Sequence, residues 1–151
     1  MSNKRSELTE VLKQIGRKAL WAPVAVLIVH WLAGAWLGHE PFVDPVMHFS
    51  GGLAAAYFFW HAASFARRYL GDLSPLGLGL LSFGLTTVAA VGWEMAEFVG
   101  DRLRETHVQV DLANTMRDLI LGVAGAVVYL GVGRWLLRAR PTHGESYRDS
   151  P

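Results

Sequence analysis

The sequence predicts an all-α, polytopic membrane protein: an antiparallel bundle of four transmembrane helices with both termini in the cytoplasm. Hydrophobic residues make up 52% of the 151 residues, whereas charged residues make up only 18%. Four apolar stretches are each long enough to cross about 30 Å of hydrocarbon as a helix. These stretches lack the polar face that a surface helix of a soluble domain presents, so a soluble helical bundle is the weaker alternative.

The segment before the apolar region predicts a short amphipathic helix. Within residues 1–18, Leu8, Val11, Leu12 and Ile15 recur at i, i+3, i+4 and i+7, the spacing of one apolar helix face. Such a helix either lies on the inner leaflet or extends the first span into the cytoplasm, and both readings stay open. We therefore treat residues 1–18 as a cytoplasmic N-terminal segment.

The transmembrane domain is predicted to cover residues 19–138, with spans at 19–38, 46–66, 75–100 and 112–137. The first span contains Ala33-Gly34-Ala35, which resembles a signal-peptidase site. Because a long segment precedes this span and the apolar run continues past the site, we expect an uncleaved anchor. Residues 139–151 are polar, with two Pro and one Gly, and predict a disordered cytoplasmic tail.

The distribution of Lys and Arg predicts the orientation. Eleven of the 14 Lys and Arg residues flank the N-terminus, the second connection and the C-terminal tail, and three flank the first and third connections. The positive-inside rule then places both termini in the cytoplasm. The expected location is the bacterial cytoplasmic (inner) membrane, with the lipid bilayer as the main partner. No basic stripe of the nucleic-acid-binding type is present, and the absence of Cys excludes disulfides and thiolate metal sites.

Polar residues recur at helical spacing at the predicted outer ends of three spans, and they are the candidate site. Ionisable groups are costly beside hydrocarbon, so inside a span they are functional candidates by default. The residues of each span share one helix face, and the short third connection makes the third and fourth spans neighbours. We therefore expect one cluster. Its candidate residues are Asp44, His48, Glu94, Glu97, Asp101, Asp111, Asn114 and Asp118.

A cluster of carboxylates with one imidazole predicts a site for a divalent metal ion. Carboxylates held together at low dielectric must take up protons or a cation, and oxygen ligands with one imidazole suit Zn, Mn, Fe, Mg or Ca to differing degrees. Simpler roles compete: Asp44 before Pro45, and Asp111, are candidate helix N-caps. Asp118 beside Arg117 is a candidate structural ion pair. The strongest candidates for the site are therefore His48, Glu94, Glu97 and Asp118.

Small residues at four-residue spacing predict close helix packing next to these positions. Gly51 and Gly52 precede Ala55 and Ala56 in the second span, and Gly122 and Gly125 follow Asp118 in the fourth. Small-xxx-small patterns allow the backbones of membrane helices to approach closely.

Three ordered motifs resemble a known family. They read Asp44-Pro-Val-Met-His48-Phe-Ser-Gly51-Gly52, then Trp93-Glu94-Met-Ala-Glu97-Phe, then Asp111-Leu-Ala-Asn114-Thr-Met-Arg-Asp118-Leu followed by Gly122-x-x-Gly125-Ala126. Over residues 41–129 the chain resembles the YjdF-like integral membrane proteins and, more distantly, the VanZ-like family. Asn114 stands where the YjdF-like pattern often has Asp. The resemblance implies a small multi-span bacterial membrane protein.

Two functional classes follow from the candidate cluster. In the first, the protein is not an enzyme, and the cluster binds a cation or proton or forms a hydrogen-bonded network. In the second, a metal-dependent intramembrane hydrolase or transferase acts on a lipid or envelope precursor, with one carboxylate as general base. The first is preferred because the chain lacks a nucleophile motif and has only one well-placed His. Whether the protein forms a homo-oligomer is open.

Overall fold

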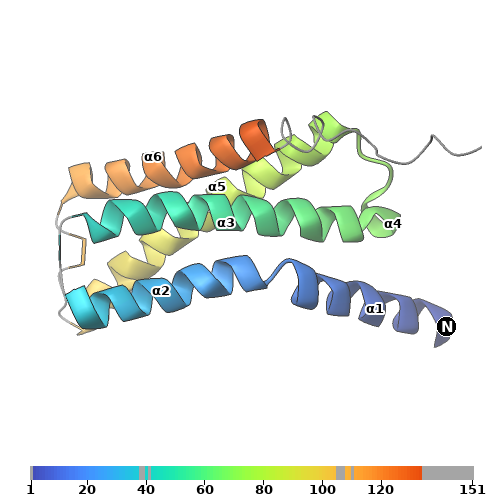
Figure 1. Ribbon diagram of the computed structural model, residues 1–151, viewed down its shortest axis with the longest axis horizontal. Helices are drawn as coiled ribbons and strands as arrows, with labels where there is room; N and C mark the ends of the chain where they lie inside the picture. The colour runs from blue at the N-terminus through green and yellow to red at the C-terminus, as the bar shows by residue number, and fades with distance from the viewer. Residues whose placement is uncertain (1, 38–39, 41, 105–107, 110, 134–151) are drawn as a thin grey trace, which may run out of the picture.

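The computed structural model describes residues 2–37, 40, 42–104, 108–109 and 111–133. All the regular structure in these ranges is helical, which confirms the all-α prediction (Figure 1). In chain order the helices are α1 (Ser2–Lys18), α2 (Trp21–Leu37), α3 (Val43–Phe65), α4 (Arg67–Leu70), α5 (Pro75–Arg104) and α6 (Leu112–Val128), and a π-helical turn (Tyr129–Gly133) continues α6.

Helix α3 is the central element. It packs against α2, α5 and α6 and also contacts α1, whereas α2 packs mainly on α3. Helices α2, α3, α5 and α6 alternate in direction along the molecule (Figure 1). As a result, the end of α2, the start of α3, the end of α5 and the start of α6 all lie at one end, on the left of Figure 1.

Length and composition qualify two helices as membrane spans, and a third if a bent pair counts as one. The two are Pro75–Arg104 and Leu112–Val132, and the bent pair is Lys4–Lys18 with Trp21–Leu37, at an angle of 42°. Helix α3 does not qualify by composition, although its 23 residues give a length of about 34 Å. Two or three spans are thus supported, and the prediction of four remains a prediction.

Several predicted boundaries need correction. The first long helix of the apolar region begins at Trp21 instead of residue 19, because the chain turns at Ala19 and Leu20. Helix α3 begins at Val43, three residues earlier than predicted, and α5 continues to Arg104. The end of the predicted fourth span and the whole of the predicted tail, 139–151, lie outside the described residues.

Hydrogen bonds from Tyr57 hold the bend between α1 and α2 against α3. The Tyr57 hydroxyl donates to the Lys18 carbonyl oxygen over 2.8 Å and accepts from Trp21 Nε1 over 3.2 Å. Near the other end of α1, Glu7 and Arg68 form an ion pair of 3.3 Å. Helix α1 therefore packs along the helical bundle as an extension of α2.

Glycines bring α3 and α6 into backbone contact. A Cβ on Gly52 would overlap the carbonyl group of Gly122, and a Cβ on Gly125 would overlap the carbonyl oxygen of Phe49. The small-residue pattern therefore has the packing role that the sequence predicts. Because His48 lies one turn before Gly52 and Asp118 one turn before Gly122, this contact brings the two side chains together.

Candidate functional site

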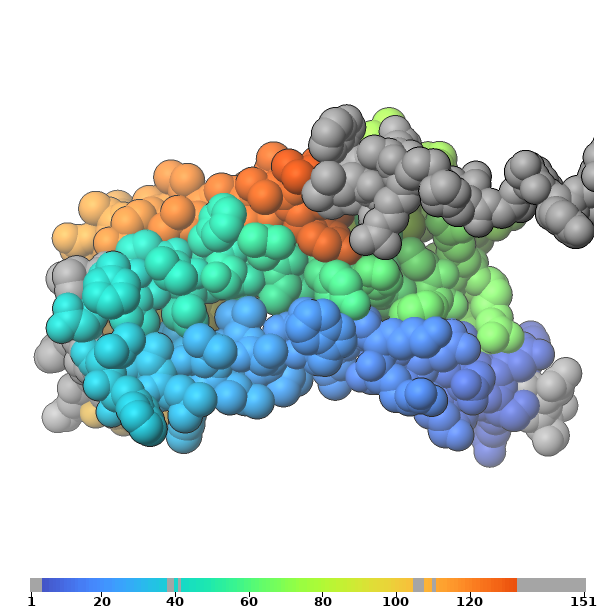
Figure 2. All heavy atoms as spheres, viewed as in Figure 1, coloured from blue at the N-terminus to red at the C-terminus, as the bar shows by residue number. Residues whose placement is uncertain are grey.

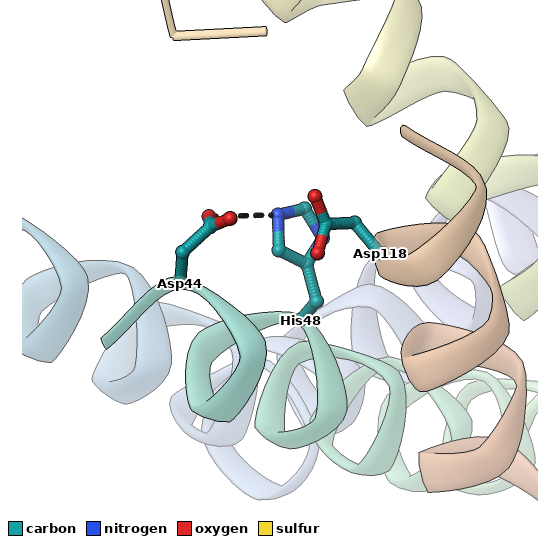
Figure 3. Close-up of side chains that lie close together, drawn as sticks. All are labelled: Asp44, His48 and Asp118. Carbon is teal, nitrogen blue, oxygen red and sulfur yellow. Dashed lines mark ion pairs between the residues drawn. The ribbon is translucent and has the colours of Figure 1, made fainter. Parts of the chain in front are cut away.

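His48 lies between two carboxylates at the end of the bundle where α3 and α6 begin. Its Nε2 atom is 3.3 Å from Asp44 Oδ1, and Asp118 approaches the ring from α6 (Figure 3). The ligand atoms of Asp44, His48 and Asp118 all lie within 4.8 Å of one another. The spacing of Asp44 and His48 on one helix face, and the neighbouring position of Asp118, agree with the predicted cluster.

Arg117 joins the two carboxylates of this group. Its Nη2 donates to Asp44 Oδ2 over 2.9 Å, and its Nε donates to Asp118 Oδ1 over 3.1 Å. The Asn114 side chain donates to Asp118 Oδ2 over 2.7 Å, and its own oxygen accepts from Arg117 Nη2 over 2.7 Å. Asp118, which is only 1% exposed, therefore has partners on both oxygens. The ion pair predicted between Arg117 and Asp118 is confirmed.

A second group forms on the other side of His48, where α5 faces it. His48 Nδ1 is 3.4 Å from Glu94 Oε1, and the ligand atoms of His48, Glu94 and Glu97 also lie within 4.8 Å of one another. The Glu94 side chain is only 6% exposed. Its Oε1 atom is buried and has no hydrogen-bond partner among the described residues. A buried carboxylate oxygen without a donor is rare and requires a physical explanation.

The remaining contacts of this second group hold its carboxylates in place. Glu97 Oε1 accepts from Trp93 Nε1 over 2.6 Å. Glu94 Oε2 accepts from the Gln109 side chain over 3.1 Å, and the same amide nitrogen donates to the Glu94 carbonyl oxygen over 2.9 Å. Asp101 in turn accepts from the backbone N–H groups of Val108 and Gln109, over 3.0 and 2.8 Å. Gln109 thus lies against Glu94, and Asp101 holds the backbone at residues 108 and 109.

Three of the eight predicted residues have roles outside both groups. Asp111 is the N-cap of α6, and its carboxylate accepts from the backbone N–H of Asn114 over 2.8 Å, as the capping alternative predicts. Asp101 binds the backbone at residues 108 and 109, and Asn114 holds Asp118. The five others, Asp44, His48, Glu94, Glu97 and Asp118, form the two groups.

The capping role predicted for Asp44 is wrong. The N-cap of α3 is Phe42, and it makes no side-chain capping hydrogen bond. Asp44 lies inside the first turn and Pro45 follows it there, where the missing N–H of proline removes no helical hydrogen bond. The Asp44 side chain is consequently free to pair with Arg117 and His48.

Two residues that hold the carboxylates, Trp93 and Gln109, were not among the predicted site residues. Trp93 lies four residues before Glu97, so the i, i+4 rule could have identified it as a donor to that carboxylate. Gln109 lies 15 residues from Glu94 along the chain, and no spacing rule links a residue in a connection to a helix that precedes it. Arg102, near the end of the same helix, lies over the Phe98 ring, 5.3 Å from its centroid.

Residues 11–139 match the family described as "Predicted membrane protein (DUF2238)". The chain belongs to this family. A similar protein is an uncharacterised protein of Thermotoga maritima, which is 33% identical over 106 residues. The alignment covers 66% of this chain and 54% of that protein, so the chain spans about half the length of its relative. No solved structure matches the chain. Membership of this family and the apolar helices together establish a membrane protein.

Proposed function

We propose that His48, Glu94 and Glu97 bind a divalent metal cation at the outer end of a helical membrane bundle. The observation that carries the proposal is the Glu94 Oε1 atom, which is buried, has no hydrogen-bond donor and faces His48 Nδ1 at 3.4 Å. A cation between these atoms would satisfy the carboxylate oxygen and balance its charge. These three residues form the proposed metal site.

The contacts of His48 favour a lone pair on Nδ1. Its other nitrogen, Nε2, is 3.3 Å from Asp44 Oδ1, and a carboxylate there stabilises the tautomer that carries its proton on Nε2. Histidines that bind metals characteristically donate their second ring N–H to a carboxylate in this way. Asp44 therefore acts as the positioning residue, and Nδ1 is available to the cation.

The spacing of the atoms fits a small divalent ion. Two ligand atoms that are each about 2.1 Å from a metal at a tetrahedral angle lie about 3.4 Å apart, which is the separation of His48 Nδ1 and Glu94 Oε1. Glu97 supplies a third ligand atom within 4.8 Å of the others. One imidazole nitrogen and two carboxylate oxygens suit Zn, Mn or Fe(II) better than the softer or larger ions.

The neighbouring group, with Asp44, His48 and Asp118, is a weaker candidate. Both oxygens of Asp118 and one oxygen of Asp44 are already bound by Arg117 or Asn114. The guanidinium supplies positive charge there, so no further cation is required. No Lys or Arg contacts Glu94 or Glu97 in the part of the chain that the structure describes, and their charges have to be balanced in another way.

We further infer a four-span topology with both termini inside, in the inner membrane of a bacterium. Helix α3 is long enough to cross the hydrocarbon, and it contacts α2, α5 and α6. Its buried residues are all small: Gly52, Ala54, Ala56 and Ala63. A span that packs on three other helices needs less apolar surface than one that mostly faces lipid, which accounts for its composition. The motifs also support identifying this family with the YjdF-like proteins.

Metal titration of the purified protein tests the site. The protein in mild detergent is stripped with a chelator and titrated with Zn²⁺ and Mn²⁺ by calorimetry, and the bound metal is quantified by mass spectrometry. We expect one ion per chain. Glu94→Gln and Glu97→Gln remove ligands and should weaken metal binding by more than about 100-fold. Asp44→Asn should weaken it by about 10- to 100-fold, as is typical of residues that orient a metal ligand through a hydrogen bond.

Asp111→Asn provides the matched control. It removes a carboxylate from the same end of the bundle, while Asn keeps the N-cap of α6. We expect unchanged metal affinity in this variant. The proposal is refuted if the wild-type protein binds no stoichiometric ion, or if Glu94→Gln and Asp111→Asn bind it equally well.

A further inference from the structure

An apolar cavity of about 230 Å³ adjoins His48 on the side away from the membrane surface. It lies among α2, α3 and α5, and Gly122 of α6 closes part of it. A narrow gap along the seam between α2 and α3 is visible on the face drawn in Figure 2. Helix α2 forms one wall of the cavity and exposes large apolar side chains on its outer side, with Trp31 81% and Trp36 85% exposed. The cavity therefore lies just behind a lipid-facing helix.

The polarity of the cavity changes along its length. Near the site, each of the three helices contributes one ring that has a polar nitrogen: His30, His48 and Trp93. Deeper in the cavity, seven residues away along each helix, the lining residues are Pro23, Ala55 and Thr86. Seven residues correspond to about 10 Å of helix.

The deep end presents no free polar group to a ligand. The Thr86 hydroxyl donates to the Ser82 carbonyl oxygen over 2.8 Å, so its hydrogen is already used. At the outer end, His30 and Trp93 pack edge to face with ring centroids 6.0 Å apart, which joins α2 to α5 above the cavity. An elongated cavity with polar rings at one end and apolar walls beyond fits an amphiphile that has its head at the site and its hydrocarbon chain below.

We propose that this cavity holds one acyl chain of an anionic phospholipid, whose phosphate reaches the cation at His48, Glu94 and Glu97. The second half of this statement rests on the proposed metal site, because without a cation the carboxylates would repel a phosphate. With the cation bound, the charges of the lipid head and the site are complementary. The apolar part of the cavity extends about 10 Å from the polar rings, and lipid lies on the outer side of α2. Both features favour a lipid over a water-soluble ligand.

Photo-crosslinking in vesicles tests the cavity. The protein is reconstituted in phosphatidylcholine vesicles that contain a trace of phosphatidylglycerol with a diazirine at the end of one acyl chain. After illumination, the adducts are mapped by peptide mass spectrometry. We expect adducts on the deep cavity wall, at Val26 and Ala55. Adducts that occur only on outward-facing residues such as Trp31 and Leu85 overturn the proposal.

Variants that fill the cavity give a second test. Gly51 lines the cavity and a Cβ there meets no atom within 4 Å, so Gly51→Leu can fill it without displacing a neighbour at the first carbon. Ala89→Leu fills it from the opposite wall. Each should lower the yield of cavity adducts about tenfold, equivalent to an overpacking cost of about 1.4 kcal/mol. Gly84→Leu, on α5 in open space outside the cavity, is the control and should leave the yield unchanged.

The chain and the head of the lipid are tested separately. A diacylglycerol probe with the same diazirine lacks the phosphate and reports on the chain alone, and its cavity adducts do not depend on metal. The anionic probe should label the cavity more strongly than this uncharged probe, and removal of metal should abolish this preference. Equal labelling by the two probes in metal-loaded protein overturns the phosphate contact. Failure of the metal site itself is read from the titration of Glu94→Gln, which requires no lipid.

Discussion

Two adjacent glycines on α3 should respond in opposite ways to the same substitution. Gly52 faces α6, and a Cβ there would overlap the carbonyl group of Gly122, whereas a Cβ on Gly51 meets no atom within 4 Å. Gly52→Ala should therefore destabilise the protein, and Gly51→Ala should stabilise it slightly. The pair is well matched because both residues lie in the middle of one helix and gain the same single methyl group.

The magnitude follows from the contact. Alanine is favoured over glycine inside a helix by about 0.5–1 kcal/mol, and this gain applies to both variants, so it cancels in their difference. What remains is the cost of overpacking at Gly52, typically about 1–3 kcal/mol. The obstructing atoms belong to the backbone of Gly122 and cannot rotate away. We therefore expect the free energies of unfolding of Gly52→Ala and Gly51→Ala to differ by about 3 kcal/mol, the upper end of this range. This corresponds to a factor on the order of 100 in the unfolding equilibrium.

Reversible unfolding in mixed micelles with increasing sodium dodecyl sulfate measures this difference. Circular dichroism follows the helices, and metal titration of the same samples follows the site. Because His48 lies one turn before Gly52, forcing α3 away from α6 should shift this ligand relative to Glu94 and also weaken metal binding in Gly52→Ala. Metal affinity should be unchanged in Gly51→Ala.

Equal stability of the two variants would contradict the packing of α3 on α6. Gly125→Ala gives an independent check, because its Cβ would overlap the Phe49 carbonyl oxygen on the next turn of the same interface. If Gly125→Ala is also as stable as the wild type, the interface is wrong as a whole, and the grouping of His48 with Asp118 fails with it.

Three further substitutions test the contacts around the site. Arg117→Gln breaks the ion pair with buried Asp118. Because the arginine is 45% exposed, we expect the free energy of unfolding to fall by only about 1–2 kcal/mol in the same assay. If Arg117→Gln has no such effect in an Asp118→Asn background, the pairing is confirmed, whereas an undiminished effect would contradict it. Gln109→Ala removes the donor to Glu94 and should weaken metal binding about tenfold, whereas unchanged affinity would show that Gln109 does not hold the ligand. Asp111→Ala should cost about 1 kcal/mol and speed amide hydrogen exchange in the first turn of α6, and exchange as slow as in the wild type would exclude the cap.

The periodicity of the polar residues predicts much of the cluster, because positions three, four and seven apart share a helix face in any helix. The reversal of direction between successive helices then brings three such faces to the same end. Neither step requires knowledge of side-chain packing. Glu94 and His48 could therefore be placed near each other from the sequence, as could Asp118.

The parts that could not be predicted depend on contacts between segments far apart in the chain. Asp before Pro is a common start of a helix, which makes Asp44 a candidate cap from the sequence. In the structure its carboxylate instead pairs with Arg117, which lies 73 residues away. The binding of Gln109 to Glu94 and the central position of α3 likewise depend on tertiary packing, on which residue spacing carries no information.

The directions of the helices give a further reason to expect the cation near α5. The positive ends of two helix dipoles, at the starts of α3 and α6, lie at this end of the bundle and stabilise carboxylates in or before their first turns. Asp44 and Asp111 occupy such positions. Glu94 and Glu97 instead lie in the interior of α5, before its last turn and far from its positive end, where the dipole gives a carboxylate no stabilisation. Their charges gain nothing from the backbone and contact no arginine among the described residues, so they need a cation or a proton most. The metal titration of Glu94→Gln and Glu97→Gln distinguishes between these two.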